Sequence, residues 1–244
     1  VTDGAGREFA PAVPSTVVTV RSGGRDIRIG LVGLTIDFTI KPYVKYLPAV
    51  ESAKKQIAAM AGKTDAIVAL AHLGLPGDLA LAEEIPEIDL VLGGHEHENF
   101  VLRRGPRFTT LAKGDSNAKG VVIATLAFGA PGERPAVTAR VERMDERVTP
   151  NPAMLAEVTR WTDVAFAAFR RDGFDPERVV ARVSEPFDGR DSTVRVRPGN
   201  LTELISAALA RDVKTVDVAI LNGGSLRIDD VLLAGPITEY DIIR

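Results

Sequence analysis

The chain of 244 residues contains no cysteine. Disulfides and thiolate metal sites are therefore excluded, and any metal must be bound by His, Asp, Glu or Asn. The missing cysteines leave the compartment open, because cysteine-free chains occur both in the cytosol and outside the cell. Long apolar runs are missing too. No stretch approaches the roughly 18 residues needed to cross a bilayer, so we expect no membrane partner.

An excess of one charge is also absent. Lys and Arg number 30 against 33 Asp and Glu, which gives a net charge of −3. The basic residues are scattered, so we expect no nucleic-acid partner. The length suits one large domain or two modest ones. The sequence starts at Val1 without a Met or a signal-peptide pattern and stops at Arg244 after an apolar stretch. We therefore expect a piece of a longer or processed protein.

The first 150 residues predict an α/β layer. Apolar runs at 16–20 and 27–34 flank a Ser-Gly-Gly segment, which predicts a hairpin. Periodicity further predicts helices at 49–62 and 77–85 and strands at 65–70, 89–92, 109–112, 121–128 and 136–144. Strands alternating with helices are typical of parallel pairing. Because no helix separates the last three strands, we expect the sheet to finish in an antiparallel run.

The composition shifts at Thr149, where a second pattern begins. Asn151 is a favourable N-cap, Pro152 suits the first helical position, and apolar residues then follow one helical face to about residue 171. We expect one domain over 1–148, a linker helix over 149–175 and the beginning of a second α/β domain over 176–244. In this second part the pattern predicts strands at 179–183 and 216–221 and a helix at 201–210.

The chain has three histidines, His72, His95 and His97, and each follows a predicted strand immediately or within a few residues. Ligands collect at the carboxyl ends of strands in open α/β sheets, so three imidazoles converge there if the two strands pair in parallel. Residues i and i+2 of an extended chain share a face about 6.5–7 Å apart, a spacing that suits two neighbouring metal ions. Gly93 and Gly94 let the backbone turn sharply beside them. The alternative is three structural histidines that cluster by chance.

Two divalent ions also need carboxylate or amide ligands. Asp78, Glu96, Glu98 and Asp115 are near in sequence, but we expect all four to face solvent more often than to bind metal. Glu96 in particular should point away from the histidines on either side of it. The metal site is therefore incomplete in this sequence.

Several segments carry a family resemblance. Ala69-Leu-Ala-His-Leu-Gly74 and Leu92-Gly-Gly-His-Glu-His97 resemble the last two metal-binding motifs of calcineurin-like metallophosphoesterases, and specifically those of the 5′-nucleotidase and UDP-sugar hydrolase family. The segments 216–227 and 234–242 resemble the core of the 5′-nucleotidase C-terminal domain. The resemblance implies the C-terminal part of a metallophosphoesterase α/β domain of β-sandwich type, followed by part of an α/β nucleotide-binding domain.

The resemblance also implies roles. His72 and His95 would bind one divalent metal ion and His97 a second, with Mn, Zn, Mg, Fe and Co all open. The substrate would be a small phosphate ester, a nucleotide or a sugar phosphate. It would be held by a set of residues in the second domain: Arg197, Asn222, Gly223, Gly224 and Arg227. Glycines leave room for a ligand, and arginine offers a forked donor for phosphate. Alone, the Asn-Gly-Gly segment favours a plain turn.

The family's N-terminal motifs, Asp-x-His, the Gly-Asp metal bridge and Gly-Asn-His with an acidic residue, have no counterpart here. We therefore identify no catalytic residue in this chain and expect it to be inactive alone, whereas the intact protein would be a metal-dependent phosphoric-ester hydrolase of nucleotide breakdown. Two alternatives stay open: a degenerate phosphoesterase kept as a binding module, and a sugar-phosphate or cyclic-phosphodiester hydrolase on the same scaffold. Family members are often periplasmic or extracellular, but this sequence does not fix the compartment.

Overall fold

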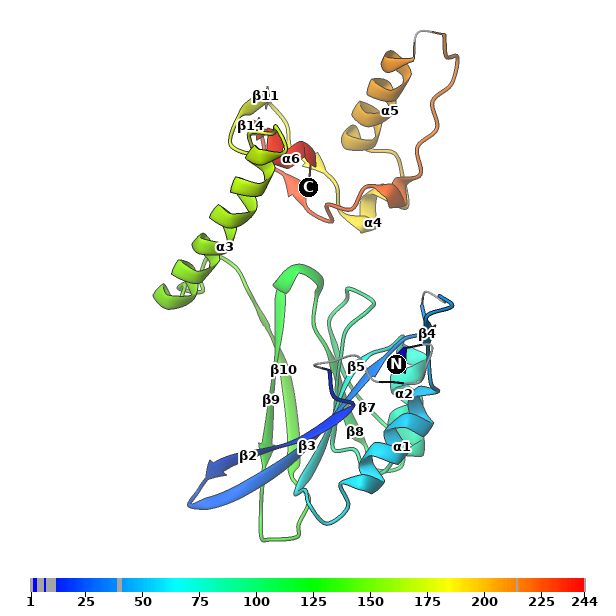
Figure 1. Cartoon of the computed structure of the whole chain (residues 1–244), viewed down its shortest axis with the longest axis vertical. Helices are drawn as coiled ribbons and strands as arrows, with labels where there is room; N and C mark the ends of the chain where they lie inside the picture. The colour runs from blue at the N-terminus through cyan, green and yellow to red at the C-terminus, as the bar shows by residue number, and fades with distance from the viewer. Residues whose placement is uncertain (1, 4–6, 8–11, 39–40, 214, 244) are drawn as a thin grey trace. The chain divides into compact units, whose positions relative to one another are not determined.

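The computed structural model describes residues 2–3, 7, 12–38, 41–213 and 215–243. Contacts divide the chain into two compact units, Val1–Thr149 and Pro150–Arg244. Both units mix helices with strands, as expected (Figure 1). Within the described ranges, no helix combines the length and the apolar character that a membrane crossing requires.

A six-stranded mixed sheet forms the centre of the first unit, in the order β2-β3-β5-β6-β8-β7. The hairpin predicted at its edge is confirmed: β2 (Ser15–Ser22) and β3 (Arg25–Thr35) pair antiparallel. Gly23 and Gly24 join them with φ of 57° and 77°, which is the backbone that a tight hairpin turn needs. From β3 onward, β5 (Ala66–His72), β6 (Leu90–Gly93) and β8 (Thr109–Lys113) pair in parallel.

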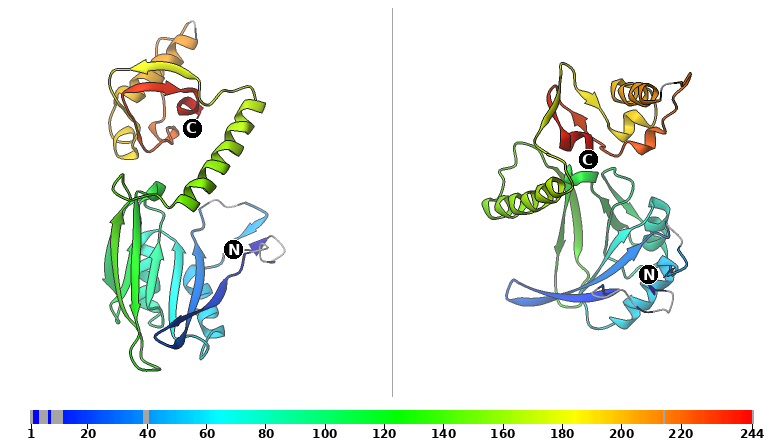
Figure 2. Two further views of the ribbon diagram at one scale, coloured as in Figure 1. Left: turned by 90° about the vertical axis from the view of Figure 1, so that its left-hand side faces the viewer. Right: turned by 45° about the horizontal axis from the view of Figure 1, so that its top comes forward.

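The predicted antiparallel finish of the sheet is wrong in part. β8 is parallel to β6, because the chain first runs out along the edge strand β7 (Phe100–Arg104) and then returns between β6 and β7. All five residues of β8 are buried in this inner place. After the short 3₁₀ turn Ser116–Ala118, β9 (Gly120–Ala127) and β10 (Ala136–Arg143) form a separate antiparallel ribbon (Figure 2).

Two helices cover one face of the sheet, α1 (Ala49–Ala59) and α2 (Leu75–Glu84) (Figure 1). Their apolar sides bury a single core with the parallel strands, in which Val32, Ala69, Leu81 and Leu111 are at most 1% exposed. Burial of such side chains contributes roughly 1.5–3 kcal/mol each. The core fixes β5 and β6 side by side, and both strands end at the same edge. A short pair, β1 (Thr2–Asp3) with β4 (Val44–Lys45), completes the unit.

The second unit begins with α3 (Pro152–Arg171), whose predicted cap forms: the Asn151 side chain accepts hydrogen bonds from Ala153 N and Met154 N. Near the C-terminal end of α3, Phe166 and Phe169 contact the ring of Tyr240. The remaining elements are short: β11 (Val179–Val183), β12 (Phe187–Asp188), α4 (Asp191–Val194), α5 (Asn200–Asp212), the 3₁₀ turn Gly223–Ser225, β13 (Val231–Leu232), β14 (Gly235–Thr238) and α6 (Glu239–Ile243). β11 pairs with β14 and β12 with β13, both antiparallel.

The strand predicted at 216–221 does not form in the described residues. Val218 is 70% exposed and Ile220 90% exposed. A strand is stabilised by hydrogen bonds to a neighbouring strand, and none of the described strands lies beside this segment. The alternation of apolar residues in this segment is therefore not sufficient to form a strand.

Candidate metal centre

Two of the three histidines come together at the carboxyl end of the parallel strands. His72 is the last residue of β5, and its carbonyl oxygen accepts a hydrogen bond from Ile36 N at 2.9 Å. His95 follows β6, the neighbouring parallel strand, after one intervening residue. The ring centroids of His72 and His95 are 5.3 Å apart, with the rings edge to face.

This pair fits two positions of one metal ion. Two imidazole nitrogens on a tetrahedral ion lie about 3.3 Å apart, given metal–nitrogen bonds of about 2.0–2.1 Å. Rings with centroids 5.3 Å apart can present nitrogens at that separation. Across the described part of the chain, no three His, Asp or Glu side chains form a group that could hold a metal ion by themselves. His97 therefore does not complete a three-histidine group with the pair.

The backbone at His95 and His97 is unusual for residues with side chains. Their φ angles are 91° and 60°, in the left-handed half of the map. Residues other than glycine in such conformations cost of order 1–3 kcal/mol each and persist only where the surroundings enforce them. This strain lies at the two histidines of the candidate site, which is where functional strain is expected.

The two glycines before them have roles that differ from the predicted one. Neither Gly93 nor Gly94 has a positive φ, so they do not make the sharp turn. A Cβ on Gly93 would lie 2.8 Å from Lys113 Cε and 3.0 Å from Cγ. A Cβ on Gly94 would lie 3.6 Å from His72 Nδ1, an ordinary contact. Gly93 therefore makes room for the side chain of Lys113.

A buried ionic cluster lies under the histidine loop. The side chain of Lys113 is 2% exposed, and its Nζ lies 2.6 Å from Asp78 Oδ2 and donates to Leu73 O at 2.7 Å. The same ammonium also contacts Glu96 Oε2, while Glu96 Oε1 accepts from Leu75 N at 2.5 Å.

The expectation of a solvent-facing Asp78 is therefore wrong. Asp78 lies in the first turn of α2 and is completely buried, because this turn faces the sheet where β8 ends. Its Oδ1 atom has no hydrogen-bond partner among the described residues. Glu96 points into this cluster, and its side chain is only 26% exposed. Glu98 is exposed, and Asp115 accepts a hydrogen bond from Asn99 at 2.7 Å.

The pKa values of Asp78 and Glu96 are shifted in opposite directions. Burial raises the pKa of Asp78 above its usual value, and the opposing effect of Lys113 does not cancel it. Burial also acts to raise the pKa of Glu96, but the Lys113 ammonium and the Leu75 N–H outweigh it, so the net pKa is lowered.

Sequence reasoning missed Lys113. The predicted strand stopped one residue short of it, at Ala112, and lysine is rarely buried unless it is paired. A charged residue at the end of a strand whose other residues are all apolar or threonine is the only signal that the sequence offers.

In the second unit the predicted substrate residues separate into two groups. Arg197 and Gly223 line one cavity of about 370 Å³ near α5. Asn222, Gly224 and Arg227 are not part of its lining. The Asn222 side chain accepts a hydrogen bond from Gly224 N at 3.0 Å, so it holds the turn, as the plain-turn reading has it. A Cβ on Gly223 would lie 2.2 Å from Val194 O, which explains the glycine by close packing.

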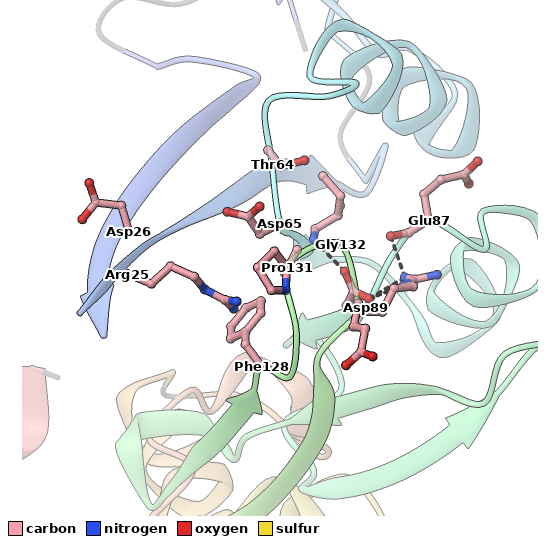
Figure 3. A pocket seen from close by; sticks show the side chains of 13 residues that line it. Arg25, Asp26, Thr64, Asp65, Glu87, Asp89, Phe128, Pro131 and Gly132 are labelled. Atoms are coloured by element: carbon pink, nitrogen blue, oxygen red, sulfur yellow. Dashed lines mark hydrogen bonds and ion pairs between the residues drawn. The ribbon is translucent and has the colours of Figure 1, made fainter. Parts of the chain in front are cut away.

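Another cavity, of about 310 Å³, opens where β3, β5 and β6 begin, which is the end of the sheet opposite to the histidines. Figure 3 shows the side chains that line it. Arg134 there donates to Asp89 Oδ1 at 2.6 Å and to Glu87 O at 2.8 Å, and Asp89 in turn accepts from Ile67 N. These bonds tie the β9–β10 connection to the sheet. Arg134 and Asp89 are occupied with each other and with backbone groups, which indicates a structural role for this pair.

Comparison with known proteins gives this geometry its context. Residues 179–244 match the family described as "5′-nucleotidase, C-terminal domain". Over 96% of its length the chain is 25% identical to an uncharacterized metallophosphoesterase, YunD, of Bacillus subtilis, and over 88% it is 22% identical to a 5′-nucleotidase of Diplobatis ommata. The resemblance to the 5′-nucleotidase family is confirmed.

Solved structures of this family share the fold. The chain superposes on a 5′-nucleotidase precursor from Thermus thermophilus with a TM-score of 0.71, 26% identity and 94% of the chain covered. A 5′-nucleotidase from Candida albicans, 15% identical, has a TM-score of 0.67 and shows the likeness of fold alone. The chain spans 48% of the YunD relative, 41% of the Diplobatis relative and 48% of the Thermus chain, about half of each.

Proposed function

We propose that the intact protein is a metal-dependent phosphoric-ester hydrolase of the 5′-nucleotidase type, acting on a nucleoside monophosphate or a nucleotide sugar. The observation that carries this proposal is the His72–His95 ring pair at adjacent parallel strand ends, in a chain whose C-terminal part matches the 5′-nucleotidase family. Bound divalent ions would act as Lewis acids toward the phosphoryl oxygens.

His72 and His95 would hold one of two ions and His97 the other. The 5.3 Å separation of the first two rings supports their assignment to one ion. The rest of the ligand set, including the histidine that stabilises the transition state in the family, would come from outside this sequence. We therefore propose that the 244-residue chain alone has little or no turnover, measured as phosphate release from AMP with added Mn²⁺.

Substrate binding would belong to the second unit. Arg197 lines the 370 Å³ cavity and offers a forked donor to a phosphate, and Gly223 lies on the same wall. Asn222, Gly224 and Arg227 would join them only through a change in the loop that holds them, because Asn222 is engaged with Gly224.

The test is a calorimetric titration of the chain with Mn²⁺. We expect His72→Ala and His95→Ala each to weaken binding at least about tenfold, because each removes a ligand of the same ion. The double variant should bind Mn²⁺ no more weakly than either single variant, because one substitution already disrupts the site that the two histidines share. Glu98→Ala, an exposed change in the same loop, is the matched control. Wild-type affinity in both single variants would refute the proposed site.

A further inference from the structure

Lys113 is a fully buried charge with an unusual set of contacts. Its side chain is 2% exposed, yet it carries an ammonium group among the apolar residues of β8. A buried charge costs free energy unless carboxylates and hydrogen-bond acceptors compensate it. Lys113 has three such partners: Asp78, Glu96 and the carbonyl oxygen of Leu73.

Two of these partners adjoin the histidines. Leu73 directly follows His72, and Glu96 stands between His95 and His97. A single ammonium group therefore ties together the backbone after the first histidine and the side chain between the other two. The third partner, Asp78, anchors the ammonium to the first turn of α2 at 2.6 Å.

Glu96 is held at both of its oxygens. One contacts Lys113, and the other accepts a hydrogen bond from Leu75 N at 2.5 Å. Leu75 is the first residue of α2, and the N-terminus of a helix favours a negative charge. Glu96 therefore also spans the two segments that carry the histidines, from the loop after β6 to the helix after β5.

This attachment accounts for the strained backbone beside it. His95 and His97 have positive φ angles, a conformation that surrounding contacts must enforce. The side chain between them is held by Lys113 and Leu75, which fixes the loop from which the two histidines project. Gly93 permits this, because a Cβ there would collide with the Lys113 side chain.

We propose that Lys113 is a positioning residue of the metal centre, which acts through Glu96 to fix the loop that carries His95 and His97, with His95 beside His72. The inference rests on the proposed function for its metal, but its structural basis is the Lys113–Glu96–Leu75 connection. A simple buried ion pair would stabilise the unit without any specific effect on the histidine loop.

The test separates these two roles with Glu96→Ala. This variant keeps the buried Lys113–Asp78 pair, so the unit should still fold, and it releases only the loop. We expect amide hydrogen exchange at residues 94–98 to become at least about tenfold faster, with exchange in β5 and β8 unchanged. Mn²⁺ affinity should fall about 10- to 100-fold, the usual effect of losing a group that orients a ligand.

Glu98→Ala is the matched control, since Glu98 is exposed in the same loop. Lys113→Met should give the same two effects as Glu96→Ala, whereas Lys63→Met, at an exposed lysine that donates to Ala59 O, should give neither. If Lys113→Met does not fold, the Glu96→Ala result decides.

Unchanged exchange at 94–98 in Glu96→Ala would overturn the positioning role. Faster exchange with unchanged Mn²⁺ affinity would overturn it too, because the loop would then be held for another purpose. A wild-type chain that binds no Mn²⁺ would instead refute metal binding by His72 and His95 in this chain, and the positioning of metal ligands with it. The exchange data would then still show whether the connection orders the loop.

Discussion

Gly93 on β6 has no side chain, and this absence makes room for the side chain of Lys113 on β8. It ends β6 with an ordinary strand backbone, and the space above its Cα is filled by the methylene chain of Lys113 on β8. The ammonium can reach Glu96 and Asp78 only because this path is open. Glycine is therefore required at position 93 for the space that it leaves, not for its backbone freedom.

We predict that Gly93→Ala destabilises the first unit by about 1–3 kcal/mol, the usual cost of overpacking a tight interior. The new Cβ would lie 2.8 Å from Lys113 Cε and 3.0 Å from Cγ, so the buried lysine must move. Denaturant unfolding of the chain measures the change.

Gly33→Ala is the control for this substitution, because Gly33 lies on β3 with nothing closer than 3.9 Å to the added Cβ. It should change the stability by no more than about 0.5 kcal/mol. Equal effects of the two substitutions would contradict the steric explanation.

At the scale of elements, Asp188 joins the short strand β12 to the helix α4. It accepts hydrogen bonds from Arg190 Nε at 2.8 Å and from Thr193 Oγ1 at 2.9 Å. The Arg190 guanidinium, with help from Thr193, holds the pKa of Asp188 far below its usual range. Both elements are too short to be stable alone, so contacts of this kind maintain them.

We predict that this contact weakens in acid. A carboxyl group whose pKa is depressed on folding stabilises the fold fully above its unfolded pKa, about 3.9, and the contribution is lost as the pH falls further toward the folded pKa. Asp188→Asn should therefore lower the thermal midpoint of the second unit at pH 7 and make it less dependent on pH below 4.

Circular dichroism melts between pH 2 and pH 7 measure this dependence. Asp163→Asn, an exposed change on α3, is the control and should leave the profile unchanged. If Asp188→Asn shows the same acid dependence as the wild type, this dependence arises from other carboxylates.

At the scale of the whole molecule, the two units differ in how much apolar core they contain. The first unit has one continuous core between the sheet and two helices. Among the described residues of the second unit few apolar side chains are buried, and none of them lies on α3; they include Val194, Leu201, Leu232 and Ile237. Burial of apolar surface is the main stabilising contribution, so the units should differ in stability.

We predict two transitions in differential scanning calorimetry of the chain, with the second unit unfolding at the lower temperature. Gly93→Ala should shift only the upper transition and Asp188→Asn only the lower one, since each residue belongs to one unit. A single transition that both substitutions shift alike would show that the units unfold as one.

Local patterns in the sequence determined most of the elements and the family resemblance. Alternating and helical periodicities located the β2–β3 hairpin, α1, α2 and the parallel strands, and Asn151 and Pro152 marked the start of α3, because these signals depend on near neighbours along the chain. The order of strands and helices placed His72 and His95 at one sheet edge, since parallel strands of one layer end together.

The tertiary structure alone decided what lies beneath that edge. The insertion of β8 between β6 and β7 brings Lys113 under the histidine loop, and the packing of α2 buries Asp78 beside it. It also decided that residues 216–221 form no strand in the described chain, because a strand needs a partner that the segment itself does not encode. Pairings between segments distant in sequence are set by the competition for burial in one core, which no local pattern records.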